Sequence, residues 1–264
     1  MSKKRNLWKV LCSVLVLMLG VIFYTADAPK EVQAATKGLS AYKRITTYRS
    51  QKIGSTTYTM KYNDKTRTST VYAKKNGKTK AIIKKCGNNC VTNGKVFYYS
   101  TGTHYSYGYL PNYKNIQIKS YTLSTGKTRT LYTRSGISGM LSPVACDGTY
   151  LYFGTGTQYG DAFTDLRVLN LKTGEIISTG CTVSSIQKVN NKILVSAADY
   201  PHGGNLCLLN RDGSGKKMIT SNNVISVKVT KKYIYYTEAT YSWSTRKCRC
   251  KLNGTGAKAL TKWS

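Results

Sequence analysis

A turn followed by a short apolar segment recurs four times along this chain, at intervals of roughly 40 to 55 residues, the range expected of repeat folds. The copies are Asn93–Tyr99, Asp147–Phe153, Asn191–Val195 and Lys231–Tyr236. A second motif, a short strand that ends in a glycine turn, recurs in register with the first. Its glycines are Gly77, Gly126, Gly174, Gly215 and Gly256, which lie 49, 48, 41 and 41 residues apart. Two motifs in register indicate one structural unit that has been copied about five times.

Each unit divides into four short segments separated by turns. In the last unit these segments are Ile225–Val229, Tyr233–Thr237, Lys247–Leu252 and Ala257–Thr261. The second segment is almost continuously apolar in every copy, as in a strand covered on both faces, whereas the third alternates, as in a strand nearer solvent. Four-stranded units that bury their faces against neighbouring units are propeller blades, so the sequence predicts an all-β β-propeller of about five four-stranded blades. In the first and least regular unit, we expect Arg44–Arg49 and Thr57–Tyr62 to be the two inner strands.

The start of the chain has the pattern of a signal peptide. Basic residues precede an apolar run, Leu11–Tyr24, and Val32-Gln33-Ala34 supplies the small or branched residues of a cleavage site. The run is shorter than the roughly 20 residues that a membrane-spanning helix needs, which favours cleavage over an uncleaved anchor. We therefore expect residues 1–34 to be a signal peptide and residues 35–264 to be a β-propeller-like repeat domain. That domain has no transmembrane segment and is secreted, either free outside the cell or associated with the cell wall.

The chain is strongly basic. Its formal net charge is +31, and residues 35–264 contain 36 Lys and Arg against eight Asp and Glu. Charge of this size attracts polyanions, which outside a membrane are acidic wall polymers, acidic polysaccharides, anionic lipid head groups or free nucleic acid. A solvated basic surface without a dedicated partner is the alternative, because net charge also governs solubility and nonspecific attraction.

Seven cysteines follow residue 34, an odd number that cannot all pair within one chain. The pair Cys86 and Cys90, and the pair Cys248 and Cys250, could each be half of a metal site. However, no histidine lies near either pair, and zinc sites usually show C-x2-C spacing. Buried apolar thiols are the favoured interpretation, so we predict neither a metal nor a cofactor.

Three segments carry a resemblance to a known family. They are Gly148-x-x-Leu151-Tyr152-Phe153, Lys232-Tyr233-Ile234-Tyr235-Tyr236 and Leu209-Asn210-Arg211-Asp212-Gly213-Ser214-Gly215. These resemble the blades of bacterial secreted proteins whose domain is named for the propeller of low-density lipoprotein receptor-related protein, and more loosely those of TolB propellers. The resemblance covers residues 90–264 well and 40–85 poorly, and it implies a propeller. The chain lacks the Tyr-Trp-Thr-Asp tetrapeptide of the receptor propellers, so the resemblance does not imply their ligand-binding roles for this chain.

The long loops between second and third strands are expected to emerge together and form one surface, here called the loop face. These loops are Asn63–Thr68, Ser100–Asn115, Gly154–Asp165, Ala198–Asn205 and Glu238–Arg246. They gather five of the eight acidic residues after position 34, both histidines, and aromatic side chains that can stack on sugars or bases. The ligand-binding candidates are His104, Tyr107, Tyr159, Asp161, Asp165, Asp199, Tyr200, His202, Glu238, Tyr241 and Trp243. Alternatively, the acids serve loop turns and the tyrosines cover neighbouring loops.

Motifs of common enzymes are missing: the chain has neither Gly-x-Ser-x-Gly nor His-Glu-x-x-His. Asp212–Lys216 resembles a calcium or phosphate loop, but Asn253–Gly256 occupies the same place in the next unit, which favours a hairpin turn. We therefore predict no catalytic residue and no enzymatic activity.

The sequence favours a binding or interaction module at the bacterial cell envelope. Its basic body would attract an acidic cell-wall polymer or glycan, its loop face would take a specific ligand, and another surface protein is a further partner class. The alternative function is a carbohydrate-active enzyme, a polysaccharide lyase or glycosidase, that uses Asp161, Asp165, Asp199 and His202.

Overall fold

The computed structural model describes residues 39–105, 112–159, 162–197, 204–242 and 244–264. These residues belong to one compact unit, Ala34–Ser264. The predicted signal peptide lies outside the described residues. Among the residues that are described, no helix is long and apolar enough to cross a membrane.

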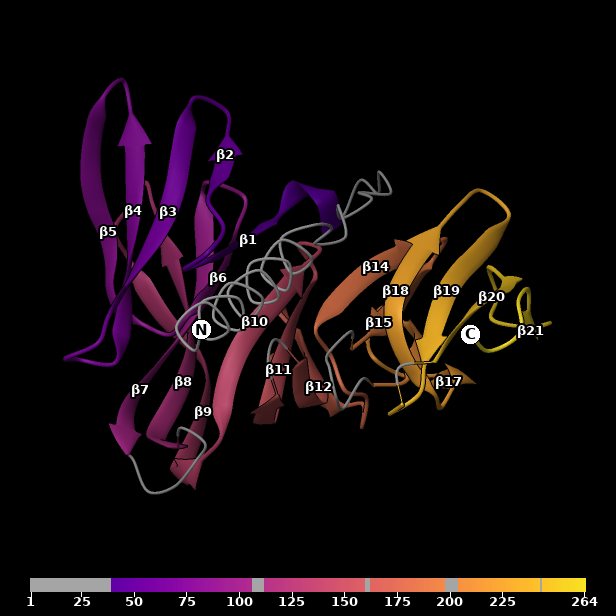
Figure 1. Ribbon diagram of the computed structural model, residues 1–264. Coiled ribbons are helices and arrows are strands. Elements are labelled where there is room, and N and C mark those ends of the chain that lie inside the picture. The colour runs from indigo at the N-terminus through magenta and orange to yellow at the C-terminus, as the bar shows by residue number, and fades with distance from the viewer. Residues whose placement is uncertain (1–38, 106–111, 160–161, 198–203, 243) are drawn as a thin grey trace, which may run out of the picture. The chain divides into compact units, whose positions relative to one another are not determined.

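Five antiparallel sheets follow one another along the chain, in order from indigo to yellow in Figure 1. A short 3-10 helix, η1 (Leu39–Ala41), precedes them. The first sheet contains β2 (Gln51–Ile53), β3 (Thr56–Asn63), β4 (Thr68–Lys75) and β5 (Lys78–Cys86). The second contains β1 (Lys43–Thr46), β6 (Asn89–Thr92), β7 (Val96–Tyr105), β8 (Asn112–Thr122) and β9 (Thr128–Ser138).

The third sheet contains β10 (Met140–Cys146), β11 (Tyr150–Tyr159), β12 (Ala162–Asn170) and β13 (Ile176–Ser178). The fourth contains β14 (Ser185–Val189), β15 (Lys192–Ser196), β16 (Leu206–Asn210) and β17 (Lys217–Thr220). The fifth contains β18 (Asn223–Val229), β19 (Tyr233–Ala239), β20 (Thr245–Lys251) and β21 (Lys258–Ala259). This architecture confirms the prediction of an all-β propeller of about five blades: four of the sheets have the predicted four strands, and β1 adds a fifth strand to the second sheet.

Hairpin turns occur at the positions that the glycine-turn motif predicts. Asn76 and Gly77 both have positive φ, 49° and 76°, as a two-residue hairpin turn between β4 and β5 requires. The segment Asp212–Lys216 links β16 to β17, and the Asp212 carboxylate accepts a hydrogen bond from the Ser214 amide at 2.9 Å. Its interpretation as a hairpin turn is therefore confirmed.

Strand β1 departs from the prediction. We expected Arg44–Arg49 to be an inner strand of the first blade, but β1 pairs with β6 and forms the edge of the second sheet, with Lys43 opposite Thr92. The reason is the burial of Ile45, which is 0% exposed and packs in the same cluster as Cys90 and Phe97. The other predicted inner strand is correct, since β3 is the second strand of the first sheet.

Polar side chains join the edge strands of several sheets. Arg44 Nη1 on β1 donates to the carbonyl of Ser184, which directly precedes β14, at 3.0 Å. With the Asn89 amide turned so that its oxygen faces Arg44, that oxygen accepts from Arg44 Nη2 at 3.1 Å and also from the Ser142 hydroxyl. Strand β1 therefore links residues of the second, third and fourth sheets.

Apolar clusters fill the spaces between consecutive sheets. On β11, Leu151, Tyr152 and Phe153 are all 0% exposed. Leu151 and Phe153 pack with the second sheet, whereas Tyr152 packs with the fourth. This alternation confirms the prediction of a second strand covered on both faces for the third sheet.

The first and last sheets bury only one face each. On β3, Tyr58 and Met60 are buried while Lys61 is exposed. On β19, Ile234 is buried, but Tyr235, which we expected to be buried, is partly exposed. None of the four clusters formed by described residues contains side chains of both the last and the first sheet. Side chains on the outward faces of both terminal sheets, such as Lys61 and Tyr235, are at least partly exposed.

Truncation of Tyr152 tests the packing between the third and fourth sheets. We expect Tyr152→Ala to lower the free energy of unfolding by about 3–5 kcal/mol, because the side chain is fully buried. Tyr152→Phe should cost only about 1 kcal/mol, because it keeps the ring and removes a hydroxyl that lies 3.0 Å from both Asp147 Oδ2 and the Arg211 carbonyl. Urea denaturation measures both values. Equal losses for the two variants would contradict the packing role of the ring.

Candidate functional site

The predicted ligand-binding residues divide into two groups. Tyr107, Asp161, Asp199, Tyr200, His202 and Trp243 lie outside the described residues. Of Tyr159, only the backbone is described, at the end of β11 opposite Ala162. The four that can be placed with their side chains are His104, Asp165, Glu238 and Tyr241.

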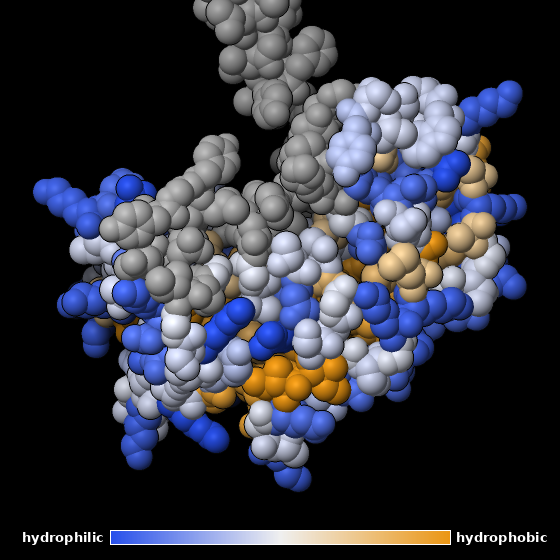
Figure 2. Space-filling model, turned by 90° about the horizontal axis from the view of Figure 1, so that it is seen from below, coloured by the Kyte–Doolittle hydropathy of each residue, from blue (hydrophilic) through white to orange (hydrophobic). Residues whose placement is uncertain are grey.

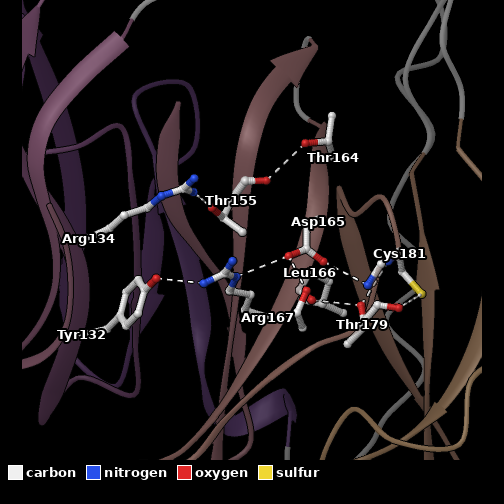
Figure 3. Close-up of polar contacts among 11 residues, drawn as sticks. Tyr132, Arg134, Thr155, Thr164, Asp165, Leu166, Arg167, Thr179 and Cys181 are labelled. Atoms are coloured by element: carbon white, nitrogen blue, oxygen red, sulfur yellow. Dashed lines mark hydrogen bonds and ion pairs between the residues drawn. The ribbon is translucent and has the colours of Figure 1, made fainter. Parts of the chain in front are cut away.

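Asp165 on β12 is the centre of a polar network between the second and third sheets (Figure 3). Its Oδ2 accepts from the Ser178 hydroxyl at 2.7 Å and from Arg167 Nε at 3.3 Å, and its Oδ1 accepts from the Gly180 amide at 3.0 Å. The side chains of Asp165 and Arg167 are 22% and 27% exposed. Three donors from its own sheet therefore hold this carboxylate in one orientation.

Arg167 carries the network to the second sheet. Its Nη1 donates to the Tyr132 hydroxyl of β9 at 2.8 Å, and its guanidinium lies 5.9 Å from the centre of the Tyr132 ring. A parallel contact runs from Arg134 Nη1 to the Thr155 hydroxyl at 2.9 Å (Figure 3). The arrangement presents two guanidinium groups beside one anchored carboxylate, a pattern that suits recognition of an anionic or hydroxyl-rich group. Tyr132, Arg134 and Arg167 were not predicted as site residues, because they lie on strands and not in the long loops.

Glu238 at the end of β19 is 2% exposed and has three partners. Its oxygens accept from Thr220 Oγ1 at 2.6 Å, Asn222 Nδ2 at 3.0 Å and Arg246 Nε at 2.7 Å. Burial alone raises the pKa of this carboxyl, but the three hydrogen bonds and the Arg246 charge outweigh burial, so the pKa lies below its usual 4.5. These contacts tie β19 to β20 and to the β17–β18 turn, as a carboxylate with a structural role would.

The lowered pKa of Glu238 predicts a pH effect on stability. Because the folded state depresses this pKa, the ion pair stabilises the protein above about pH 4.5, and its contribution is lost as pH falls toward the folded pKa. We expect Glu238→Gln to lower the free energy of unfolding at pH 7 by roughly 1–3 kcal/mol and to flatten its fall between about pH 5 and 3. Chemical denaturation across that pH range measures both effects. Parallel curves for the two proteins would contradict this role.

The ends of two neighbouring hairpins meet on the loop face. The His104 ring stands edge-on against Tyr113, with centres 5.5 Å apart. Tyr113 lines a small pocket together with Arg67 and Lys85, and its pKa is raised, foremost by burial. The β3–β4 and β7–β8 ends therefore lie together, as expected for these two loops. Tyr241 of the β19–β20 loop is 71% exposed and free to contact a ligand.

All seven cysteines of the described residues are buried free thiols, in agreement with the favoured interpretation of the sequence. Two of them interact: a hydrogen bond from the Cys207 thiol lowers the pKa of Cys181 and raises that of Cys207. Cys181 is 1% exposed, so its sulfur is shielded from solvent. Within the described part of the chain, no three metal-binding side chains cluster.

Basic residues dominate the surface of the first sheet. Residues 51–86 contain ten Lys or Arg, every one exposed, and the single acidic residue Asp64. In Figure 2, hydrophilic side chains project at the left and right margins of the view. Ion pairs join Asp147 to Arg211, Asp165 to Arg167 and Glu238 to Arg246, all outside the first sheet. The first sheet is thus an exposed concentration of positive charge.

The fold has relatives among solved structures, although no family model and no curated protein matches the chain. TolB from Acinetobacter baumannii has 12% identity and a TM-score of 0.38, and the match covers 80% of this chain and 52% of that one. A puromycin hydrolase has 9% identity and a TM-score of 0.49, with 82% and 37% covered. A putative TolB from Agrobacterium tumefaciens has 10% identity and a TM-score of 0.43, with 83% and 87% covered.

The chain thus spans about half of the Acinetobacter protein and less of the hydrolase. Likeness at this level of identity concerns the fold, and one fold hosts many functions.

Proposed function

We propose that this chain is a secreted, non-enzymatic binding module that holds an acidic polymer of the cell envelope on the outward face of its first sheet. The observation that carries the proposal is the set of exposed lysines on that face, Lys52, Lys61 and Lys74, within a sheet whose residues 51–86 hold ten exposed basic side chains and one acid. A surface of one sign raises the local concentration of a polymer of the opposite sign and speeds its capture.

The outward face of the first sheet, called the first-sheet face, has a regular arrangement. Directly opposed residues share a face, which places Lys52, Thr57 and Lys74 in one row across β2, β3 and β4. Strand spacing sets Lys52 and Lys74 roughly 10 Å apart at the backbone, and Lys61 lies roughly 13 Å further along β3. These separations exceed about one Debye length at physiological salt, so each lysine can meet a separate anionic group.

Protection of the sheet edge is the alternative explanation of these charges. Lysines on an edge strand block pairing with other sheets, and β5, with Lys78, Lys80, Lys84 and Lys85, is the edge of the first sheet. That explanation does not extend to Lys61, which stands on the face of an inner strand, 5.7 Å over the Tyr72 ring. Charge on the face as well as on the edge supports binding of a polyanion.

Reversal of three charges tests the first-sheet face. We expect Lys52→Glu, Lys61→Glu and Lys74→Glu together to weaken binding to polyphosphate and to alginate, a polyuronate, at least tenfold. The number of counterions released on binding polyphosphate, measured as the slope of log affinity against log salt concentration, should fall by roughly two to three. The matched control is Lys95→Glu, Lys127→Glu and Lys172→Glu, which changes the net charge equally at exposed turns of other sheets. Affinity that does not change with salt concentration, or an equal loss of affinity in both triple variants, would contradict the proposal.

The proposal includes a specific ligand on the loop face, supported by Tyr241, which is 71% exposed, and by the anchored Asp165. We expect alanine at Tyr200, His202, Tyr241 and Trp243 to abolish binding of a glycan identified on an array. Stability should change by no more than about 0.5 kcal/mol per exposed substitution. Thermal unfolding measured beside Tyr152→Ala checks this. A loop variant as unstable as Tyr152→Ala would show that these aromatics are packing residues.

The carbohydrate-active enzyme is the competing function, and turnover separates it from binding. Asp165 already accepts three hydrogen bonds, which supports an anchoring role over proton transfer. New reducing ends or unsaturated products, released from wall or host glycans by the purified protein, would establish the enzyme.

A further inference from the structure

We infer that the outward face of the last sheet is a second binding surface, one that takes sugar rings of an acidic polysaccharide. This surface, called the last-sheet face, consists of Ser226, Lys228, Tyr233, Tyr235, Thr237, Lys247, Arg249 and Lys251. It goes beyond the proposed function, because it stands on a different sheet and adds aromatic recognition to charge.

Strand register places these residues together. Tyr235 lies between Lys228 of β18 and Arg249 of β20, and Tyr233 lies opposite Lys251. Directly opposed residues share a face, and the alternate residues of β19 and β20, such as Ile234 and Cys250, are buried on the inner side. The tyrosines and the basic side chains therefore stand on the outward side, where all of them are at least partly exposed.

The aromatic groups are held in a fixed arrangement. The rings of Tyr233 and Tyr235 meet edge to face, with centres 6.1 Å apart and planes at 71°. The Arg249 guanidinium lies 4.5 Å from the centre of the Tyr233 ring, a close cation–π contact. Rigid aromatics that are already in place lose little conformational entropy when a ligand binds.

Charge excludes a second copy of the chain as the occupant. A head-to-tail stack would bring Lys228, Lys247 and Arg249 against the lysines of the first-sheet face, and contacts between like charges are unfavourable. An anionic partner is complementary to both faces. The occupant is therefore an acidic polymer.

Hydroxyl groups and the crossed rings favour a sugar over a nucleobase. Ser226 donates to Thr237 at 2.9 Å, so hydroxyls lie beside the aromatic pair where sugar hydroxyls can bond. One face of Tyr233 is covered by Arg249, and Tyr235 stands at a steep angle to it, which leaves no pair of parallel rings for a flat base. An acidic polysaccharide, with rings, hydroxyls and negative charge, matches all three features.

The test compares two polyanions that differ in having rings. With the chain from residue 35 onward, Tyr233→Ala with Tyr235→Ala should weaken binding to alginate at least tenfold and leave binding to polyphosphate within twofold. The control, Tyr233→Phe with Tyr235→Phe, keeps the rings and should retain at least a third of the alginate affinity. Arg249→Met, which removes charge but keeps the stem, should weaken binding to both polymers.

Oligothymidylate, a single-stranded nucleic acid, serves as a third probe. Three outcomes would overturn the inference: alginate affinity unchanged by the alanine pair, an equal loss of affinity for alginate and polyphosphate, or a loss of affinity for oligothymidylate alone, which would identify nucleic acid as the ligand. If the alanine pair fails to fold by circular dichroism, Tyr235→Ala alone takes its place, with the same outcomes. The first-sheet charge reversal leaves these tyrosines in place. If polymer affinity is unchanged by that charge reversal but alginate affinity falls with Tyr235→Ala, the inference stands while the proposed function fails.

Discussion

Burial of one inner strand of each middle sheet, β7, β11 or β15, between two neighbouring sheets is the constraint on which the rest of the structure depends. An isolated four-stranded sheet of this size cannot bury its own apolar side chains, so each sheet is stable only beside another. The alternation of Leu151, Tyr152 and Phe153 between two clusters shows how one strand serves both neighbours. At roughly 1.5–3 kcal/mol for each fully buried large apolar side chain, these contacts dominate the stability of the stack.

The same constraint explains where charge and function can be placed. A strand buried on both sides has no room for lysine, and β7 and β11 contain neither lysine nor arginine. Only the terminal sheets have a whole face to offer, and both use it for basic residues, threonine and tyrosine. Because both faces carry exposed basic side chains, a contact between these faces in two copies of the chain is unfavourable. Polar ties such as Arg211 with Asp147, at 2.7 Å, fix the sheets without occupying those faces.

Local periodicity allowed the repeat, the hairpin turns and the inner strands to be predicted, because those features depend on neighbouring residues. Strand β1 could not be predicted, since it contains one buried apolar residue and its partner, β6, lies about 45 residues away. The contact of Arg167 with Tyr132 likewise joins two sheets through strand residues that look ordinary in sequence. Glu238 is different: Arg246 lies directly opposite it in one hairpin, so hairpin register could have revealed the pair before the structure did.

The pairing of β1 with β6 makes the two ends of the stack unequal. The chain enters the second sheet, leaves to form the whole first sheet, and returns to the second sheet, so the first sheet is fastened at both of its chain ends. At the other end, Ser264 exchanges backbone hydrogen bonds with Thr245 of its own sheet. A terminal repeat unit that packs against one neighbour opens more readily than a unit packed on both sides. We therefore expect local unfolding to start at the carboxyl-terminal sheet. The amino-terminal sheet opens only when the pairing of β1 with β6 is also broken.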